Sequence, residues 1–332
     1  MSRSHSNISI FVPHIGCPNK CSFCNQRHIT GVFNAPHPED VDSAVIAAKK
    51  SKNYDPETTE IAFFGGSFTA INREYMLGLL KAAAFYVDSG DVSGIRISTR
   101  PDAIDDEILS ILKENHVTAI ELGAQALNDR VLRMNNRGHN TADVYKASAL
   151  IKEYGFELGL QLMTGLFGDS DSSTVRTAKR VIEIAPDTVR IYPTIVLKDT
   201  DLAALNADGI YTPQTLDEAV NLAVKLYTMF TENGIKVIRL GLHSIENEAY
   251  IAGPWHPAFS ELCQSQIMLN SALKLLNEKG NYIIYVGKSD VSKMIGQKRS
   301  NLLHLVSLGY NCKVKSKDIL GNLKIEVERE KD

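Results

Sequence analysis

The 332-residue sequence has no run of about 18 apolar residues, and so it predicts no membrane-spanning helix. Its first residues, MSRSHSN, lack the apolar core of a secretory signal peptide. A net charge of −3 gives no overall nucleic-acid-binding signature. There are only five cysteines, three of them in one loop, which argues against a disulfide framework. With 44% hydrophobic residues for a large core, the sequence predicts a globular, cytoplasmic protein.

Three cysteines, Cys17, Cys21 and Cys24, follow one another near the start of the chain with a C-x3-C-x2-C spacing. The apolar run before them, residues 8–12, predicts a short buried strand, and the prolines and glycine that follow predict a loop. Structural zinc is normally closed by four protein ligands, and an iron–sulfur cube also has four ligand positions. Three thiolates without a fourth therefore indicate a cube with one iron left open to a ligand that is not protein.

This loop resembles the signature of the radical S-adenosylmethionine (SAM) superfamily. The resemblance implies a [4Fe–4S] cluster on Cys17, Cys21 and Cys24, with SAM chelating the open iron through its amino and carboxylate groups. Phe23 matches the aromatic residue that usually precedes the last cysteine in that family. The resemblance also implies a hydrogen-abstracting enzyme, a transferase or oxidoreductase, that works through a 5′-deoxyadenosyl radical.

Three plainer interpretations of the cysteine loop stay open at this point, and unrelated buried cysteines are the simplest of them. His14 or His28 could complete a Cys3His zinc site, and the protein would then be a non-enzymatic zinc module. A disulfide beside a spare thiol is the third, although nothing in the sequence indicates an oxidising compartment. The isolated Cys263 and Cys312 are expected to be buried apolar residues.

Strand-like and helix-like segments alternate six times along the first 200 residues. The predicted strands cover residues 8–12, 60–64, 94–98, 119–125, 157–163 and 188–196. Such alternation predicts a parallel sheet with right-handed crossovers. Six units indicate an α/β fold, the partial (β/α)6 TIM-like barrel that is typical of the radical enzymes. In barrels of this kind functional residues gather at the carboxyl ends of the strands.

The alternation lapses after about residue 198. A helix over residues 212–233 carries a capping-box pattern, Thr215-x-x-Glu218. Beyond it we expect helices over 259–279 and 291–308 and strands over 235–240, 282–286, 312–315 and 323–327. The predicted organisation is a barrel over residues 1–205, a connecting helix within 206–234 and a small C-terminal α+β domain over 235–332.

Two strand ends supply candidate SAM-binding residues. Gly65, Gly66 and Ser67 follow the second strand, where glycines let the backbone approach a ligand. In the radical SAM family a similar motif binds the SAM amino group through backbone carbonyls, although Ser67 stands where that motif has an acid. Thr99 and Arg100 end the third strand, and an arginine there could clamp the SAM carboxylate. A salt bridge from Arg100 to Asp102 or Asp105 is the plainer alternative.

Later strand ends supply the remaining candidates. Gln125 shares a strand face with Glu121, and Gln161 lies on the fifth strand. Polar residues on an inward face need partners or a ligand, so both glutamines are predicted cofactor-binding residues. Amides satisfied by the backbone are the alternative. Tyr192 and Lys198 stand where the family often places substrate-facing residues, and we predict catalytic roles for them. Lys198 could instead be a solvated surface charge.

Five further segments resemble the branch of the superfamily that contains the catalytic subunit of Elongator. They are STRPD at 98–102, ELGAQ at 121–125, NNRGHN at 135–140, LMTGLFGDS at 162–170 and RIYPTIVLKDTDLA at 190–203. The chain departs from that branch in the short spacing of its first two cysteines. It also leaves too little sequence after the barrel for the acetyltransferase domain of that subunit. A product other than an acetyl-CoA-dependent one is therefore expected.

The resemblance to this branch predicts a base in RNA, either tRNA or rRNA, as the substrate. A local basic bias supports it, because residues 288–332 hold ten Lys and Arg against six Asp and Glu. Lys293, Gln297, Lys298 and Arg299 fall on or near one helix that could contact phosphates, and a solvated helix face is the alternative. An electron donor such as flavodoxin or ferredoxin is a further expected partner. The alternative substrate is a small molecule such as a porphyrinogen, because enzymes with this cysteine spacing include oxidative decarboxylases of that kind.

Overall fold

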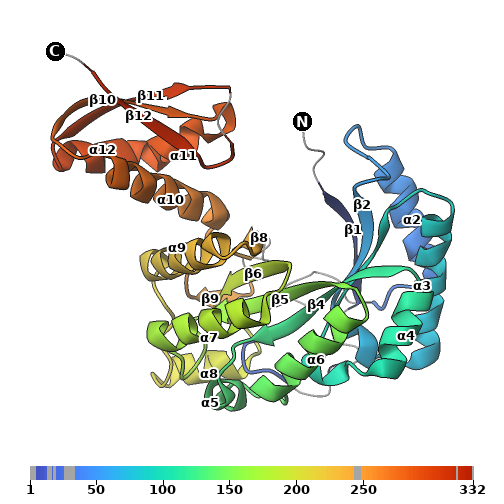
Figure 1. The fold of residues 1–332 in the computed structure, drawn as a ribbon. Coiled ribbons are helices and arrows are strands. Elements are labelled where there is room, and N and C mark those ends of the chain that lie inside the picture. Colours follow the sequence, from blue (N-terminus) through green and yellow to red (C-terminus); the bar gives the residue numbers. More distant parts are fainter. Residues whose placement is uncertain are drawn as a thin grey trace.

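The computed structural model describes residues 5–12, 17, 20–25, 34–242, 248–318 and 321–330. Figure 1 shows a large curled sheet with helices around its outside and a smaller sheet near the C-terminus. Among the helices in these ranges, none is both long and apolar enough to cross a membrane.

The large sheet consists of seven parallel strands that follow one another in chain order. They are β1 (Ser6–Val12), β2 (Thr59–Gly65), β3 (Gly94–Thr99), β4 (Val117–Gln125), β5 (Glu157–Thr164), β6 (Thr188–Pro193) and β8 (Lys236–Leu240). Right-handed crossovers between strands in this order place their helices on one side, so the sheet curls into a half-barrel. The predicted α/β partial TIM-like barrel is confirmed.

The strand β8 is the main difference from the predicted sheet. It pairs with β6 in parallel, with Thr188 opposite Lys236 and Ile191 opposite Leu240. From the sequence we count six strand–helix units and assign residues 235–240 to the C-terminal domain. We do so because the apolar pattern of this strand does not show which sheet it joins. The half-barrel therefore has seven strands rather than six.

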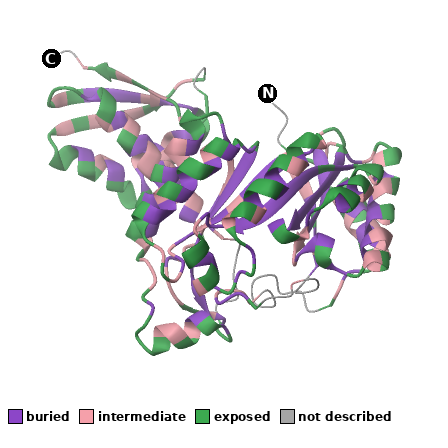
Figure 2. Ribbon diagram, turned by 60° about the horizontal axis from the view of Figure 1, so that its bottom comes forward, coloured by how far each residue is buried: buried purple, intermediate pink, exposed green. Residues whose placement is uncertain are grey.

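Amphipathic helices cover the outside of the half-barrel. They are α2 (Pro38–Lys49), α3 (Arg73–Asp88), α4 (Asp106–Glu114), α6 (Thr141–Glu153), α7 (Asp171–Ile184) and α9 (Leu216–Glu232). In α4, Ile108, Leu109 and Leu112 are buried, and the Asp105 side chain caps the helix by accepting from the Ile108 N–H. Both halves of the predicted capping box at the start of α9 are present. Figure 2 shows the sheet largely buried while the outer faces of the helices are exposed.

The two faces of each strand have different roles, as β4 illustrates. Ile120, Leu122 and Ala124 belong to the apolar core between sheet and helices. Glu121 and Gln125 alternate with them and so face the concave side of the half-barrel. The concave side of the half-barrel is therefore polar, and its side chains can contact a ligand or substrate in the interior.

Shorter elements complete the half-barrel at the carboxyl ends of its strands. These are α5 (Asp129–Met134), β7 (Val196–Leu197), α8 (Asp201–Ala207) and β9 (Tyr250–Ala252). The strands β7 and β9 pair in an antiparallel two-stranded sheet. The strand predicted over 188–196 thus divides, because β6 ends at Pro193 and β7 belongs to another sheet.

The C-terminal region forms a second core of its own. Its elements are α10 (Phe259–Leu275), β10 (Gly280–Val286), α11 (Val291–Ile295), α12 (Ser300–Ser307), β11 (Tyr310–Ser316) and β12 (Ile325–Arg329). The strands form a sheet in the order β11-β10-β12, and α10 packs against α9 of the half-barrel. The single helix predicted over 291–308 is wrong. Gly296, Lys298 and Arg299 have φ angles of +78°, +49° and +66°, which break it into α11 and α12.

Candidate active site

A cavity of about 140 Å³ lies at the carboxyl ends of β2, β3 and β4, beside the cysteine loop. It contains all three predicted metal ligands and seven of the eight predicted cofactor-binding residues. Its lining residues are Cys17, Lys20, Cys21, Phe23, Cys24, Gly65, Gly66, Ser98, Thr99, Arg100, Gly123, Gln125, Arg137 and Gln161. Residues that are up to 144 positions apart in the sequence therefore meet at one place, because parallel strands end at a common edge.

The described part of the cysteine loop is fixed by contacts to distant segments. The N–H of Cys24 donates to the carbonyl of Cys21, which forms a tight turn. Within that turn, the backbone N–H and the hydroxyl of Ser22 both bind Asn135, at 3.2 and 2.8 Å. The carbonyl of Ser22 accepts from the N–H of Leu202 at the start of α8. The loop is therefore held from two sides before any cofactor enters.

Arg137 connects the turn between α5 and α6 to the cysteine loop. Its Nη1 lies 3.1 Å from the sulfur of Cys21, and its Nη2 donates to the carbonyl of Gly123 at 2.6 Å. The side chain is buried, and its Nε has no hydrogen-bond partner in the described structure. Arg137 therefore places a buried positive charge directly beside the sulfur of Cys21 and ties it to the end of β4.

The surroundings of Cys17 act on its thiol in opposite directions. Two effects raise the pKa of Cys17: burial, which is the larger, and the neighbouring Cys21. A hydrogen bond from the Ser67 backbone and the charges of Arg100 and Arg137 oppose that rise. The charges of Arg100 and Arg137 would also stabilise the Cys17 thiolate once a metal ion had displaced its proton.

Gly65 and Gly66, at the end of β2, line the cavity with backbone atoms only. Gly65 has a φ of +110°, and a Cβ built on it would lie 2.9 Å from the carbonyl oxygen of Val12. The N–H of Gly66 donates to that same carbonyl at 2.7 Å. Only glycine fits position 65 without moving β1, and its lack of a side chain leaves room for a ligand.

Ser67 turns away from the cavity and supports the end of β3 instead. Its hydroxyl lies 2.9 Å from that of Thr99 and accepts from the N–H of Arg100 at 3.2 Å. It is 1% exposed. Of the eight predicted cofactor-binding residues it is the one that does not line the cavity, and its contacts hold two that do.

Arg100 lines the cavity with its guanidinium already engaged. Its Nε and Nη2 donate to the two carboxylate oxygens of Asp102 at 2.9 and 2.8 Å, and Nη2 also donates to the carbonyl of Arg137. Burial alone would raise the pKa of Asp102, but the hydrogen bonds and charge of Arg100 hold it below its usual value. The alternative pairing with Asp102 is thus present, with the guanidinium buried and the carboxylate partly exposed.

Gln125 and Gln161 close the side of the cavity nearest the barrel interior. Gln125 has a φ of +62°, a sparsely populated conformation for a residue other than glycine. The Nε2 atom of Gln161 donates to the Ser98 hydroxyl at 3.2 Å and to Glu121 at 3.1 Å. Glu121 in turn binds Arg190 through two hydrogen bonds of 2.7 and 2.8 Å. A buried polar network thus begins at the cavity and continues down the half-barrel.

The two predicted catalytic residues do not line this cavity. Tyr192 lies near Arg190 and Glu121, and burial raises the pKa of its phenol. Lys198 is exposed beyond β7, and its backbone binds Ala249 and Asn25. Their roles stay predictions.

The residues of the cavity fit a cube with three protein ligands. The part of the lining that the structure describes holds the three thiols and no His, Asp or Glu side chain that could serve as a fourth ligand. Among the residues that the structure describes, no three His, Cys, Asp or Glu side chains lie close enough together to hold one metal ion, so the three thiols line one cavity but would have to move closer to bind a cluster. The zinc alternative involves His14 or His28, which lie outside the described residues.

Arg137 is the functional residue that sequence reasoning missed, along with Lys20 in the cysteine loop. The NNRGHN segment carries the only signal for Arg137, since it places a basic residue shortly after a strand that ends in the site. Nothing in that segment shows that Asn135 would bind Ser22 and so bring Arg137 to Cys21.

Comparison with known proteins agrees with this geometry. The sequence model of the Radical SAM superfamily matches residues 11–181, which is more than half of the chain. That of the Radical_SAM C-terminal domain matches residues 186–269. Together the two matches run from the end of β1 into α10.

Individual relatives are distant. The chain is 26% identical to a tRNA uridine(34) acetyltransferase of Dehalococcoides mccartyi over 62% of its own length, and it spans about half (52%) of that protein. It is 27% identical to an uncharacterized protein of Methanocaldococcus jannaschii, covering 82% of this chain and 79% of the relative. Protein YhcC of Escherichia coli is 25% identical over 56% of this chain and 62% of its own length.

A solved structure shares the fold. The archaeal Elp3 of Methanocaldococcus infernus superposes with a TM-score of 0.67 at 20% identity, over 81% of this chain and 64% of that one. The superfamily uses a [4Fe–4S] cluster and SAM as cofactors. The chain belongs to the radical SAM superfamily and is a radical SAM enzyme.

Proposed function

We propose that the protein modifies a base in RNA by radical chemistry that begins in the cavity beside the cysteine loop. The observation that carries the chemistry is the set of three thiols, Cys17, Cys21 and Cys24, which share one cavity whose described lining has no fourth ligand side chain. The RNA substrate is supported by the relatives named as tRNA uridine(34) acetyltransferases.

In this proposal Cys17, Cys21 and Cys24 would hold the cluster, and SAM would lie against Gly65 and Gly66. When bound, the cluster and SAM supply a 5′-deoxyadenosyl radical that abstracts hydrogen from the substrate. An electron donor such as flavodoxin or ferredoxin would deliver the electron that starts each turnover. The chemistry belongs to the cofactors, and the protein supplies orientation and excludes water.

Residues of this chain have definable tasks around those cofactors. Arg100, fixed by Asp102, would present its remaining N–H groups to the SAM carboxylate at a constant orientation. Arg137 would keep the sulfur of Cys21 in place and balance the negative charge of the thiolate. Gln125 and Gln161 line the same cavity and would offer amide groups to the ligand, and Phe23 packs against two small apolar clusters beside the loop. Tyr192 and Lys198 stay proposed substrate-facing residues.

The test compares nucleosides in RNA from cells with and without the protein. Total tRNA and rRNA from a deletion strain are digested and analysed by mass spectrometry, beside RNA from strains complemented with the wild type or with Cys21→Ala. We expect one modified nucleoside to be missing in the deletion and Cys21→Ala strains and restored by the wild type. Identical nucleosides in all strains would refute the RNA substrate. Anaerobic turnover of a porphyrinogen by the purified protein would then favour the small-molecule alternative.

A further inference from the structure

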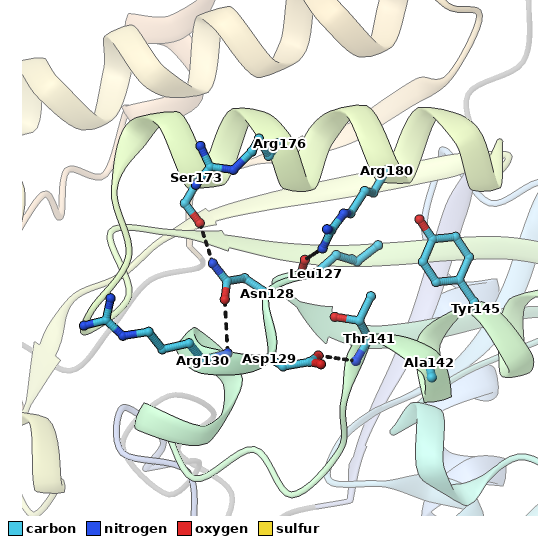
Figure 3. Close-up of a pocket in the computed structure, with 10 residues that line it drawn as sticks. All are labelled: Leu127, Asn128, Asp129, Arg130, Thr141, Ala142, Tyr145, Ser173, Arg176 and Arg180. Carbon is cyan, nitrogen blue, oxygen red and sulfur yellow. Dashed lines mark hydrogen bonds between the residues drawn. The ribbon is translucent and has the colours of Figure 1, made fainter.

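A second pocket lies close to the cavity, on the outside of the half-barrel. It has a volume of about 670 Å³ and lies among α5, the start of α6 and α7. Figure 3 shows Arg130, Arg176 and Arg180 around it, with Tyr145 at one end. We call this pocket the arginine groove.

The groove carries more positive than negative charge. Asp129 is the only acidic residue among the described side chains that line it, and its carboxylate accepts from the Thr141 N–H at 2.8 Å. Arg180 donates to the carbonyl of Leu127, which fixes its position. Arg130 and Arg176 are exposed, have no acidic partner among the described residues, and extend toward the end of the groove away from Tyr145. Two guanidinium groups are therefore available to an anion.

The groove is joined to the catalytic cavity by two short stretches of chain. Gln125 lines the cavity and Leu127 lines the groove, and the two Cα atoms can be at most about 8 Å apart. After α5 the chain returns through Arg137 in the cavity to Thr141 in the groove. The segment that runs from Gln125 through α5 to Thr141 therefore borders both the cavity and the groove.

We propose that the arginine groove binds the phosphodiester backbone of the RNA next to the base that enters the cavity. This inference rests on the proposed function. The planar guanidinium of arginine matches a phosphate with two parallel hydrogen bonds, and neighbouring phosphates in RNA present such groups in series. Tyr145, which is 37% exposed, offers a ring on which a flanking base can stack. An acidic protein segment would use the charges but not the ring, and so RNA suits the groove better.

The basic C-terminal region is the competing place for phosphate contacts. Four of its cations are paired with acids: Lys293 with Asp290, Lys313 with Glu330, Lys317 with Glu326 and Arg329 with Glu278. Lys298 and Arg299 are exposed on the segment between α11 and α12. Removing their two charges provides a matched control for removing two charges from the groove.

The experiment measures the salt dependence of RNA binding. Three proteins are compared at equal iron content and equal melting temperature. They are the wild type, the groove variant Arg130→Gln/Arg176→Gln and the control variant Lys298→Gln/Arg299→Gln. The probe is unfractionated tRNA from the deletion strain, followed by filter binding at 50–200 mM salt. Each lost phosphate contact lowers the slope of log K against log salt by about 0.7 for single-stranded RNA. Two lost contacts make the slope shallower by about 1.4. The ratio of wild-type to variant binding constants therefore falls roughly sevenfold between 50 and 200 mM salt.

The expected result is a reduced slope for the groove variant and a wild-type slope for the Lys298→Gln/Arg299→Gln control. A wild-type slope for the groove variant would overturn the proposal, as would a reduced slope for the control alone. Equal competition by polyglutamate and tRNA would indicate an acidic protein partner and would also overturn it. The nucleoside analysis separates the two proposals, because a missing nucleoside with an unchanged groove slope refutes only the groove.

Discussion

The charged network inside the half-barrel predicts a large loss of stability when Glu121 loses its charge. Glu121 is 1% exposed and accepts two hydrogen bonds from Arg190 and one from Gln161. Nη1 of Arg96 lies 3.5 Å from the same carboxylate. Arg96 has two further partners, Glu60 at 2.8 Å and Glu157 at 3.1 Å. Among the described residues, Glu121 is the acid that pairs with Arg190, so Arg190 suffers most from the change.

The size of the effect follows from the burial of Arg190, which is 9% exposed. Removing one partner of a buried ion pair typically costs about 3–5 kcal/mol, because the other charge is left buried. Glu121→Gln keeps one oxygen as an acceptor, so we expect about 3 kcal/mol, the lower end of that range. The double variant Glu121→Gln/Arg190→Met removes both charges and should recover part of the loss, with a coupling of about 1–3 kcal/mol.

Urea unfolding followed by circular dichroism measures these free energies. The control is Glu330→Gln, which breaks an exposed pair with Lys313 and should change stability by less than about 1 kcal/mol. If Glu121→Gln cost less than about 1 kcal/mol, Arg190 would have other support and the reasoning would fail. A double variant as unstable as the sum of the single variants would also refute it.

Three further changes test the site. Gly65→Ala should cost about 1–3 kcal/mol of stability and weaken SAM binding. Gly90→Ala is the control for backbone strain alone, because Gly90 has a φ of +73° and no atom within 4 Å of a built Cβ. Equal losses of stability in calorimetry would contradict the clash with Val12. Arg137→Gln removes a charge from the thiolate of Cys21, so the cluster potential should fall by roughly 65–130 mV in an EPR-monitored titration. Exposed Arg133→Gln is its control, and an unchanged potential would exclude this role. Burial and the charge of Arg137 hold the pKa of His139 at about 4, below its usual 6.5. The unfolded chain then binds more protons between pH 6.5 and 4, so stability falls on acidification by up to roughly 3 kcal/mol. His139→Gln should flatten this pH dependence in urea midpoints, and an unchanged slope would contradict the assignment.

The elements that the sequence predicts well are those with a strong apolar period. In β4 the alternation of Ile120, Glu121 and Leu122 identifies both the strand and its two faces. The capping box of α9 is local in the same way, since Thr215 and Glu218 are three residues apart. The cysteine loop and Gly65 could be placed in the site because each directly follows a predicted strand.

The features that the sequence does not predict depend on packing between distant segments. The apolar pattern of β8 shows a strand but not its pairing with β6. Tyr192 lies on a predicted strand, but the period of two does not tell how deep in the half-barrel it sits. Arg137 reaches Cys21 across 116 residues of chain, because the turn after α5 is bound to the cysteine loop. Such long-range contacts leave no mark in a single sequence.

The central claim is that Cys17, Cys21 and Cys24 hold a cluster whose open iron binds SAM. The most direct test is SAM cleavage by anaerobically reconstituted protein supplied with dithionite, with 5′-deoxyadenosine measured by mass spectrometry and the cluster followed by EPR. Our account predicts about four iron atoms per chain, release of 5′-deoxyadenosine, and an EPR signal that changes when SAM is added. The triple serine variant should lose all three, and Cys312→Ser should keep them. Wild-type protein that holds a full cluster but neither changes its EPR signal with SAM nor releases 5′-deoxyadenosine would contradict the claim.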